Sequence, residues 1–165
     1  MAVKFLLCIA ILAFTSGVGY FLASKYRQRK VFFTQFYEFN ERFLSEITYY
    51  RRPIQEFVSG YRYQGEFQVL LEEFFSTMET RAANDQKVFN LPEYHFLTAE
   101  EKVFVVDYFS MLGKGDSLSQ KGYFSSVKET LAKLQTESEK DCKRYGDLYV
   151  KIGFLCGLLI LILIV

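Results

Sequence analysis

The stretch Phe124–Val165, FSSVKETLAKLQTESEKDCKRYGDLYVKIGFLCGLLILILIV, decides the fold, because a patterned helix continues without a stop signal into an apolar end. Within it, glutamate and lysine at Glu129 and Lys133 form an i,i+4 pair in the order that supports an exposed helix. Its seam positions alternate three and four residues apart, with two polar members in the middle: Phe124, Val127, Leu131, Leu134, Ser138, Asp141, Tyr145, Leu148 and Ile152. This heptad spacing predicts a coiled-coil-like helix that begins near residue 117 and enters a membrane.

Two uncharged apolar runs predict membrane helices at the two ends of the chain. Phe5–Ala23, FLLCIAILAFTSGVGYFLA, is long enough at about 1.5 Å per residue to cross a hydrocarbon core of about 30 Å. Ile152–Val165, IGFLCGLLILILIV, covers only about two thirds of that thickness. Tyr149 and Val150 extend it, and Lys151 can place its amine near the lipid headgroups, so we expect a short span.

Positive charges set the expected topology. Lys25, Arg27, Arg29 and Lys30 directly follow the first run, which argues against a cleaved signal peptide and holds the next residues in the cytoplasm. Lys151 and the cations before it flank the second run on the same side. The prediction is an all-α, membrane-anchored helical bundle with both termini outside. Its expected parts are an N-terminal transmembrane helix (1–24), a cytoplasmic helical bundle domain (25–148) and a C-terminal transmembrane helix (149–165).

Composition narrows the functional classes. Half of the 165 residues are apolar, and 18 Phe and 12 Tyr make the chain rich in aromatic side chains. The net charge of +1 provides no field that would recruit nucleic acid. Cys8, Cys142 and Cys156 lack the spacing of metal ligands or of a disulfide framework, so neither a metal nor a cofactor is expected.

The middle of the chain has helical periodicity. A first apolar stripe has members three or four residues apart: Phe32, Phe36, Phe39, Phe43, Ile47 and Tyr50. We expect Pro53 to end that helix and Gly60 and Gly65 to form a corner. A second helix follows from Phe67. Thr98 and Glu101 have capping-box spacing ahead of a third apolar helix.

The segment Leu112–Gln120, LGKGDSLSQ, predicts a corner between two helices. Gly113 stands where a left-handed residue closes a helix, and Ser117 with Gln120 has capping-box spacing. A phosphate-binding loop is excluded, because the GxxxxGK[ST] spacing is absent. The residues assigned to this corner, with partner contact expected from its exposed charges, are Leu112, Gly113, Lys114, Asp116 and Gln120.

Few residues suggest catalysis. His95 is the single histidine, and no nucleophile elbow, HExxH motif or paired-carboxylate arrangement is present. A small membrane-bound enzyme or regulator would need a polar pocket that the sequence does not reveal. We therefore expect a protein that is not an enzyme, and loss of activity on changing His95 alone would favour the enzyme or regulator instead.

Four quoted segments, in this order and spacing, resemble the stage III sporulation protein AB family: GYFLASKYRQR (19–29), EITYYRRPIQE (46–56), LGKGDSLSQ (112–120) and GFLCGLLILILIV (153–165). The family pattern E-I-x-Y…P-[LI] is matched by Glu46, Ile47, Tyr49, Pro53 and Ile54. The corner matches an LG-x-x-D-x-x-x-Q pattern. Gly153 and Gly157 match the terminal glycines of the family, with Ile152 in place of its leucine.

The resemblance implies a role that the residues alone do not supply. Family members are mother-cell membrane proteins of endospore-forming bacteria and belong to the channel complex that links the mother cell to the forespore. Their cytoplasmic domain is similar to F-type platform proteins of type II secretion and type IV pilus systems. By analogy it would contact other membrane subunits, the bilayer and a cytoplasmic secretion-type ATPase. A platform subunit of a secretion or pilus apparatus unrelated to sporulation is the alternative.

Overall fold

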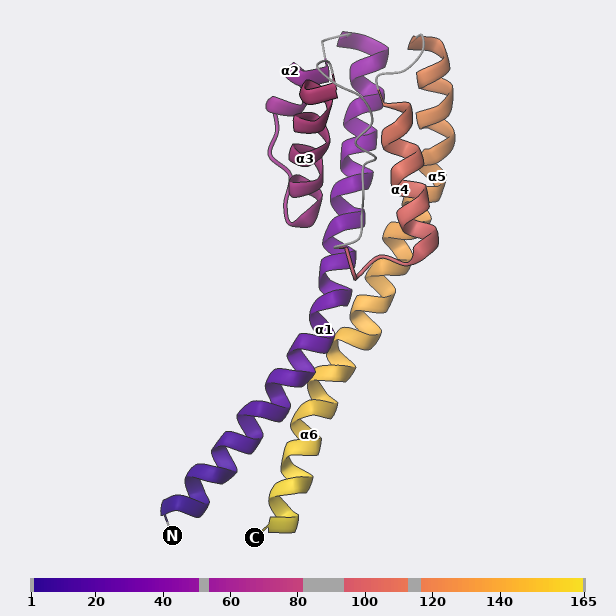
Figure 1. The fold of residues 1–165 in the computed structure, drawn as a ribbon. Coiled ribbons are helices and arrows are strands. Elements are labelled where there is room, and N and C mark those ends of the chain that lie inside the picture. The colour runs from indigo at the N-terminus through magenta and orange to yellow at the C-terminus, as the bar shows by residue number, and fades with distance from the viewer. Residues whose placement is uncertain (1, 51–53, 82–93, 113–116, 165) are drawn as a thin grey trace. The chain divides into compact units, whose positions relative to one another are not determined.

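The computed structural model describes residues 2–50, 54–81, 94–112 and 117–164, and their side chains from residue 10 to 50, at 54, from 56 to 77, from 94 to 112 and from 119 to 162. The described residues are helical apart from short turns, which confirms the all-α prediction for them. The elements, shown in Figure 1, are α1 (Ala2–Ser45), the π-helical turn η1 (Glu46–Tyr50), α2 (Ile54–Ser59), α3 (Glu66–Arg81), α4 (Ala99–Met111), α5 (Ser117–Asp141), the π-helical turn η2 (Cys142–Gly146) and α6 (Asp147–Ile164).

The chain divides into two compact units. The first, called here the paired-helix unit, consists of Met1–Lys30 with Glu137–Val165. The second, the bundle unit, is Val31–Thr136. Both predicted membrane segments fall in the paired-helix unit, and the segment predicted as the cytoplasmic domain contributes residues to both units. Each unit is described below by itself.

Phenylalanines of α1 form the centre of the bundle unit. Phe32, Phe36, Phe39 and Phe43 follow the predicted stripe and are at most 4% exposed. Their rings contact α3, α4 and α5; for example, the Phe36 and Tyr108 ring centroids are 4.6 Å apart. In Figure 1 this part of α1 has α3 on one side and α4 and α5 on the other. Burying these rings removes a large apolar area from water, which is the main stabilising contribution to such a core.

Predicted turn and capping residues position the surrounding helices. Gly65 has φ +62°, a backbone angle that residues with a Cβ rarely adopt, and α3 begins directly after it. Thr98 and Glu101 form the predicted capping box at the start of α4. The Glu101 amide donates to Thr98 Oγ1 at 3.2 Å, and the Thr98 amide donates to Glu101 Oε2 at 2.9 Å. The corner and the third helix therefore begin where the sequence predicts.

Close contact between glycines joins α1 to α6 in the paired-helix unit. A Cβ built on Gly19 would lie 2.6 Å from the Tyr149 carbonyl oxygen, and one built on Gly153 would lie 2.7 Å from the Thr15 carbonyl oxygen. A Cβ on Gly157 would collide with the Thr15 hydroxyl. Small residues that let two backbones approach are typical of helix pairs in membranes.

The two π-helical turns move helix faces away from the heptad prediction. Leu148 and Ile152, predicted on the seam of the last helix, are each 44% exposed, whereas Gly146 and Gly157 are buried. A π turn holds one more residue than an α turn, so every position after η2 is displaced by one residue. Similarly, η1 buries Glu46, and Tyr50, predicted on the first stripe, is 67% exposed. The seam predicted after η2 is therefore wrong by one position, and Tyr50 does not belong to the buried stripe.

Within the described residues, one helical stretch is long and apolar enough to cross a membrane, Ser119–Ile162. It includes α6, where most large apolar side chains are exposed. The N-terminal run Phe5–Ala23 lies within α1, but the described side chains begin only at residue 10. The expected second span is therefore not confirmed by the structure.

Candidate functional site

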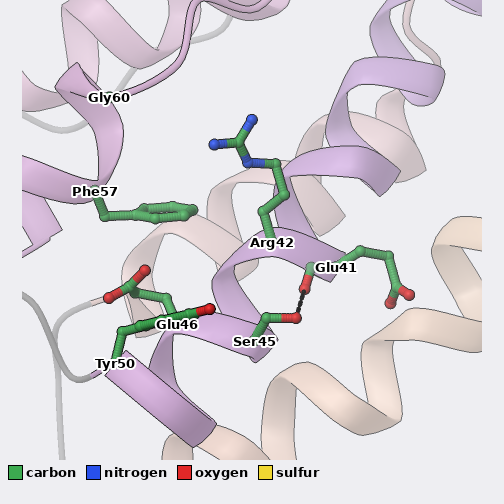
Figure 2. A pocket seen from close by; sticks show the side chains of 7 residues that line it. All are labelled: Glu41, Arg42, Ser45, Glu46, Tyr50, Phe57 and Gly60. Atoms are coloured by element: carbon green, nitrogen blue, oxygen red, sulfur yellow. Dashed lines mark hydrogen bonds between the residues drawn. The ribbon is translucent and has the colours of Figure 1, made fainter.

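A pocket of about 340 Å³ lies where α1 passes into η1 and faces α2 (Figure 2). It belongs entirely to the bundle unit. Two carboxylates, one guanidinium, two hydroxyls and one phenyl ring form its wall: Glu41, Arg42, Ser45, Glu46, Tyr50, Phe57 and Gly60. We call this the α1-end pocket.

The acidic wall of the pocket comes from α1 and η1. Glu41 Oε2 accepts a hydrogen bond from Lys128 Nζ of α5 at 2.9 Å, which raises the lysine pKa. Glu41 Oε1 is buried and has no hydrogen-bond partner among the described residues. Glu46 is only 4% exposed and lies three residues after the buried Phe43, on the same face of the helix. In Figure 2 the Glu46 carboxylate lies below the Phe57 ring.

Arg42 supplies the positive charge at the pocket edge. Its guanidinium lies 3.7 Å from the centroid of the Tyr61 ring, a cation–π contact. The Tyr61 hydroxyl donates to Glu38 Oε1 at 2.7 Å, and this hydrogen bond raises the tyrosine pKa. Ring stacking leaves the N–H groups at the edge of the guanidinium able to donate to a ligand.

The chemistry of the α1-end pocket favours binding. Its one aliphatic hydroxyl, Ser45 Oγ, donates to the backbone carbonyl of Glu41 at 3.1 Å, and the described lining contains neither histidine nor cysteine. A nucleophile needs an adjacent base, and the lining pairs this serine with none. His95, the catalytic candidate from the sequence, lies exposed in a turn before α4 and is not among the lining residues. Mixed charges beside a ring can instead hold a polar side chain of another protein.

A buried polar network next to the pocket escaped the sequence analysis. Asn40 is fully buried in α1, and its side-chain amide donates to the Phe124 carbonyl of α5 at 3.3 Å. The Tyr108 hydroxyl of α4 donates to Asn40 Oδ1 at 3.0 Å. Burial raises the pKa of that hydroxyl well above its usual value. One asparagine thus joins three helices, and its position next to Phe39 was the available signal.

The predicted corner residues and the family-matching residues lie in different places. Leu112 is fully buried and caps α4, where its amide donates to the Phe109 carbonyl at 3.3 Å. Gln120 is half-buried in α5. Neither residue lines the α1-end pocket, whereas Glu46 of the family-matching segment does. Ile47 is half-buried in η1 and Tyr49 is 78% exposed. The predicted residues outside the described part are Gly113, Lys114, Asp116 and Pro53.

The predicted membrane-flanking cations take part in contacts of the paired-helix unit. Arg29 Nη1 lies 2.7 Å from Asp141 Oδ2, an ion pair between α1 and α5. Lys25 and Arg27 each lie 5.0 Å from the centroid of a tyrosine ring on their own helix. Lys30 is half-buried and Lys151 is exposed. Asp141 was predicted on the seam but not as the partner of an arginine.

Fold and site together define the class: an all-α protein with a phenylalanine-centred bundle, a pocket at the end of its first helix and a helix suited to crossing a membrane. Within the described residues, no group of histidine, cysteine, aspartate and glutamate could hold a metal ion.

The chain belongs to the stage III sporulation protein AB family, whose family model matches residues 4–165. The predicted resemblance is thereby confirmed over nearly the whole chain. A search of curated proteins and a search of solved structures each gave no match.

Proposed function

We propose that this protein is a non-enzymatic integral-membrane component of the channel complex between mother cell and forespore, required for endospore formation. The observation that carries the proposal is family membership across residues 4–165. It favours a sporulation role over a platform subunit of another secretion or pilus apparatus. The helical stretch Ser119–Ile162 supports residence in the mother-cell membrane that faces the forespore.

The proposed topology is a membrane hairpin. The N-terminal run Phe5–Ala23 is the second span, and the intervening bundle lies in the cytoplasm with both termini outside. The contact of Gly19 with Gly153 supports this arrangement, because it pairs the two apolar helices at a backbone distance typical of membrane helices. The cations that end both apolar runs support the cytoplasmic side for the bundle.

The bundle is proposed to dock a cytoplasmic secretion-type ATPase and to contact other membrane subunits of the channel. The α1-end pocket is the proposed docking point, since it carries Glu46 of the family-matching segment and the exposed ring of Tyr50. Arginine and tyrosine, which the pocket contains as Arg42 and Tyr50, are enriched at the centre of protein interfaces.

A complementation experiment in the endospore-forming host tests the proposal. Deleting the gene should abolish heat-resistant spores, and the unchanged chain should restore them. Glu46→Gln, which removes the buried charge of the pocket, should lower the spore count at least tenfold with unchanged protein in the membrane fraction. The matched control Glu100→Gln alters an exposed carboxylate of α4 and should restore spores fully. Normal spores in the deletion strain would refute the sporulation role, and full rescue by Glu46→Gln would refute the docking point.

A further inference from the structure

The paired-helix unit carries more cations than its acids can neutralise. On α1 they follow the first apolar run, and on α5, η2 and α6 they precede the second. Six of them are exposed: Lys25, Arg27, Lys140, Lys143, Arg144 and Lys151. The acids in the same stretch are Glu137, Glu139, Asp141 and Asp147. Among the described residues, the structure gives none of the six an ion pair. The paired-helix unit therefore has a net positive charge, which is concentrated within a few turns of its two helices.

An ion pair between the helices of this unit uses a different cation. Arg29 Nη1 lies 2.7 Å from Asp141 Oδ2, and the two side chains are 14% and 40% exposed, so this pair joins the helices and neutralises one of the surface acids. Lys25 and Arg144 instead lie on the outside of the unit, in contact with tyrosine rings. Cation–π contact holds a charge in place while leaving its N–H groups able to bind an anion.

Stacked tyrosine rings hold two of these cations in place. The Tyr26 ring of α1 stacks on Tyr145 of η2 at 5.3 Å and on Tyr149 of α6 at 5.8 Å between centroids. The Lys25 ammonium lies 5.0 Å from the Tyr26 ring centroid, and the Arg144 guanidinium lies 5.4 Å from that of Tyr145. Cations from both helical arms of the unit, Lys25 of α1 and Arg144 of η2, therefore contact the same group of tyrosine rings.

The rings and cations stand at the boundary of the apolar surface. Phe21 is 76% exposed on α1, one turn before Lys25, and Phe154 and Leu155 are exposed on α6, one turn after Lys151. Tyrosine at such a boundary is typical of the membrane–water interface, where headgroup phosphates lie. We propose that this collar, defined as Lys25, Arg27, Lys143, Arg144 and Lys151 around the tyrosine stack, binds the phosphates of anionic phospholipids and selects them over zwitterionic lipids.

The positive charge of the collar and its expected depth in the bilayer together identify phospholipid as the ligand of the collar. A helix that crosses the bilayer places its flanking cations at the level of the headgroups, and each cation near an anionic surface strengthens binding by about fivefold. This inference rests on the proposed membrane span, but not on the sporulation role or on ATPase docking.

The test uses the full chain, purified in a mild detergent and incubated with equal amounts of phosphatidylglycerol and phosphatidylcholine. Native mass spectrometry then counts the lipids of each kind that stay bound. The unchanged chain should retain at least tenfold more phosphatidylglycerol than phosphatidylcholine. The variant Lys25→Gln, Arg27→Gln, Arg144→Gln should retain both lipids about equally. Equal retention by the unchanged chain, or unchanged preference in this variant, would overturn the proposal.

Two control variants separate the collar from general charge and from misfolding. The triple variant Arg62→Gln, Lys102→Gln, Lys121→Gln removes the same charge from the bundle unit and should keep the preference. The charge-conserving variant Lys25→Arg, Arg27→Lys, Arg144→Lys should keep it as well, and its loss there would contradict binding by charge. Extraction of the unchanged chain from membranes by alkaline carbonate would instead refute the span itself.

Discussion

At the scale of single residues, Asn40 connects α1, α4 and α5 from a position without solvent access. An amide can donate and accept at once, so it satisfies both the Phe124 carbonyl and the Tyr108 hydroxyl. The sequence could not predict this role, because it does not show which groups an asparagine beside an apolar stripe will contact in the folded protein. The phenylalanines around it were predictable, because burial of an apolar stripe needs only the correct periodicity.

Replacing Asn40 with leucine should lower the free energy of unfolding by about 1–3 kcal/mol, because the buried Tyr108 hydroxyl loses its acceptor and the Phe124 carbonyl loses its side-chain donor. Chemical denaturation in detergent, followed by circular dichroism, measures the change. The double variant with Tyr108→Phe should recover part of the loss, since it removes the stranded hydroxyl. A loss below about 0.5 kcal/mol in the single variant would contradict the assigned role.

Tyr63 carries the opposite feature, a buried hydroxyl without a hydrogen-bond partner among the described residues. Tyr63→Phe should therefore stabilise the protein by about 1 kcal/mol at neutral pH. Burial raises the Tyr63 pKa above its ordinary value of 10.0. Ionisation of Tyr63 thus leaves the free energy of unfolding unchanged below pH 10 and lowers it as the pH rises further, because the unfolded chain loses this proton first.

The Tyr63→Phe variant should consequently lose less stability than the unchanged chain between about pH 10 and pH 12. Thermal unfolding midpoints across this range measure the difference. Tyr49→Phe is the matched control, since that ring is 78% exposed, and it should follow the unchanged chain. Parallel curves for Tyr63→Phe and the unchanged chain would show that the buried hydroxyl does not titrate as described.

At the scale of helices, elements without interruption were predictable and the π turns were not. The capping box at Thr98 and the corner at Gly65 follow from local chemistry that the sequence states directly. In contrast, η1 and η2 each add a residue to a turn without a local signal in the sequence, and Glu46 and Gly146 within them are buried. Since a heptad prediction assumes a constant turn, it assigned Leu148 and Tyr50 to faces that these turns displace.

Deleting Lys143 from η2 should convert the π turn into an α turn, because a π turn holds one more residue than an α turn. The residues after the turn should then keep their faces, with Gly153 still against Gly19. Deleting Lys151 from the regular helix α6 should instead rotate the residues after it by about 100°. We expect the thermal midpoint in detergent to fall for the Lys151 deletion and to stay near that of the unchanged chain for the Lys143 deletion. An equal fall in both variants would contradict the assigned function of the turn.

Two glycines of α1 allow a test of the close contact between α1 and α6, because Gly19 lies at the contact and Gly17 does not. Gly19→Val places a side chain against the Tyr149 carbonyl and should destabilise the pair by about 1–3 kcal/mol, as overpacking does. Gly17→Val on the same helix meets nothing within 4 Å and serves as the control. Detergent unfolding curves distinguish the two variants. Equal effects of both substitutions would mean that the helices do not approach at Gly19.

At the scale of the whole molecule, family membership and one helix suited to a membrane support a membrane component of sporulation. The sequence could predict this much because the family motifs and the apolar ends are properties of local sequence. The α1-end pocket could not be predicted, because its residues come from α1, η1 and the α2 region and meet only in the folded bundle.

The central claim is that the bundle lies in the cytoplasm and docks an ATPase through the α1-end pocket. The most direct measurement is photocrosslinking in sporulating cells from a photoreactive residue at Tyr50, with one at Val103 of α4 as the matched exposed control. Captured proteins are identified by mass spectrometry. The account predicts a secretion-type ATPase at Tyr50 and not at Val103. Capture at Tyr50 of proteins from the outer side of the membrane only, or of no ATPase, would contradict it.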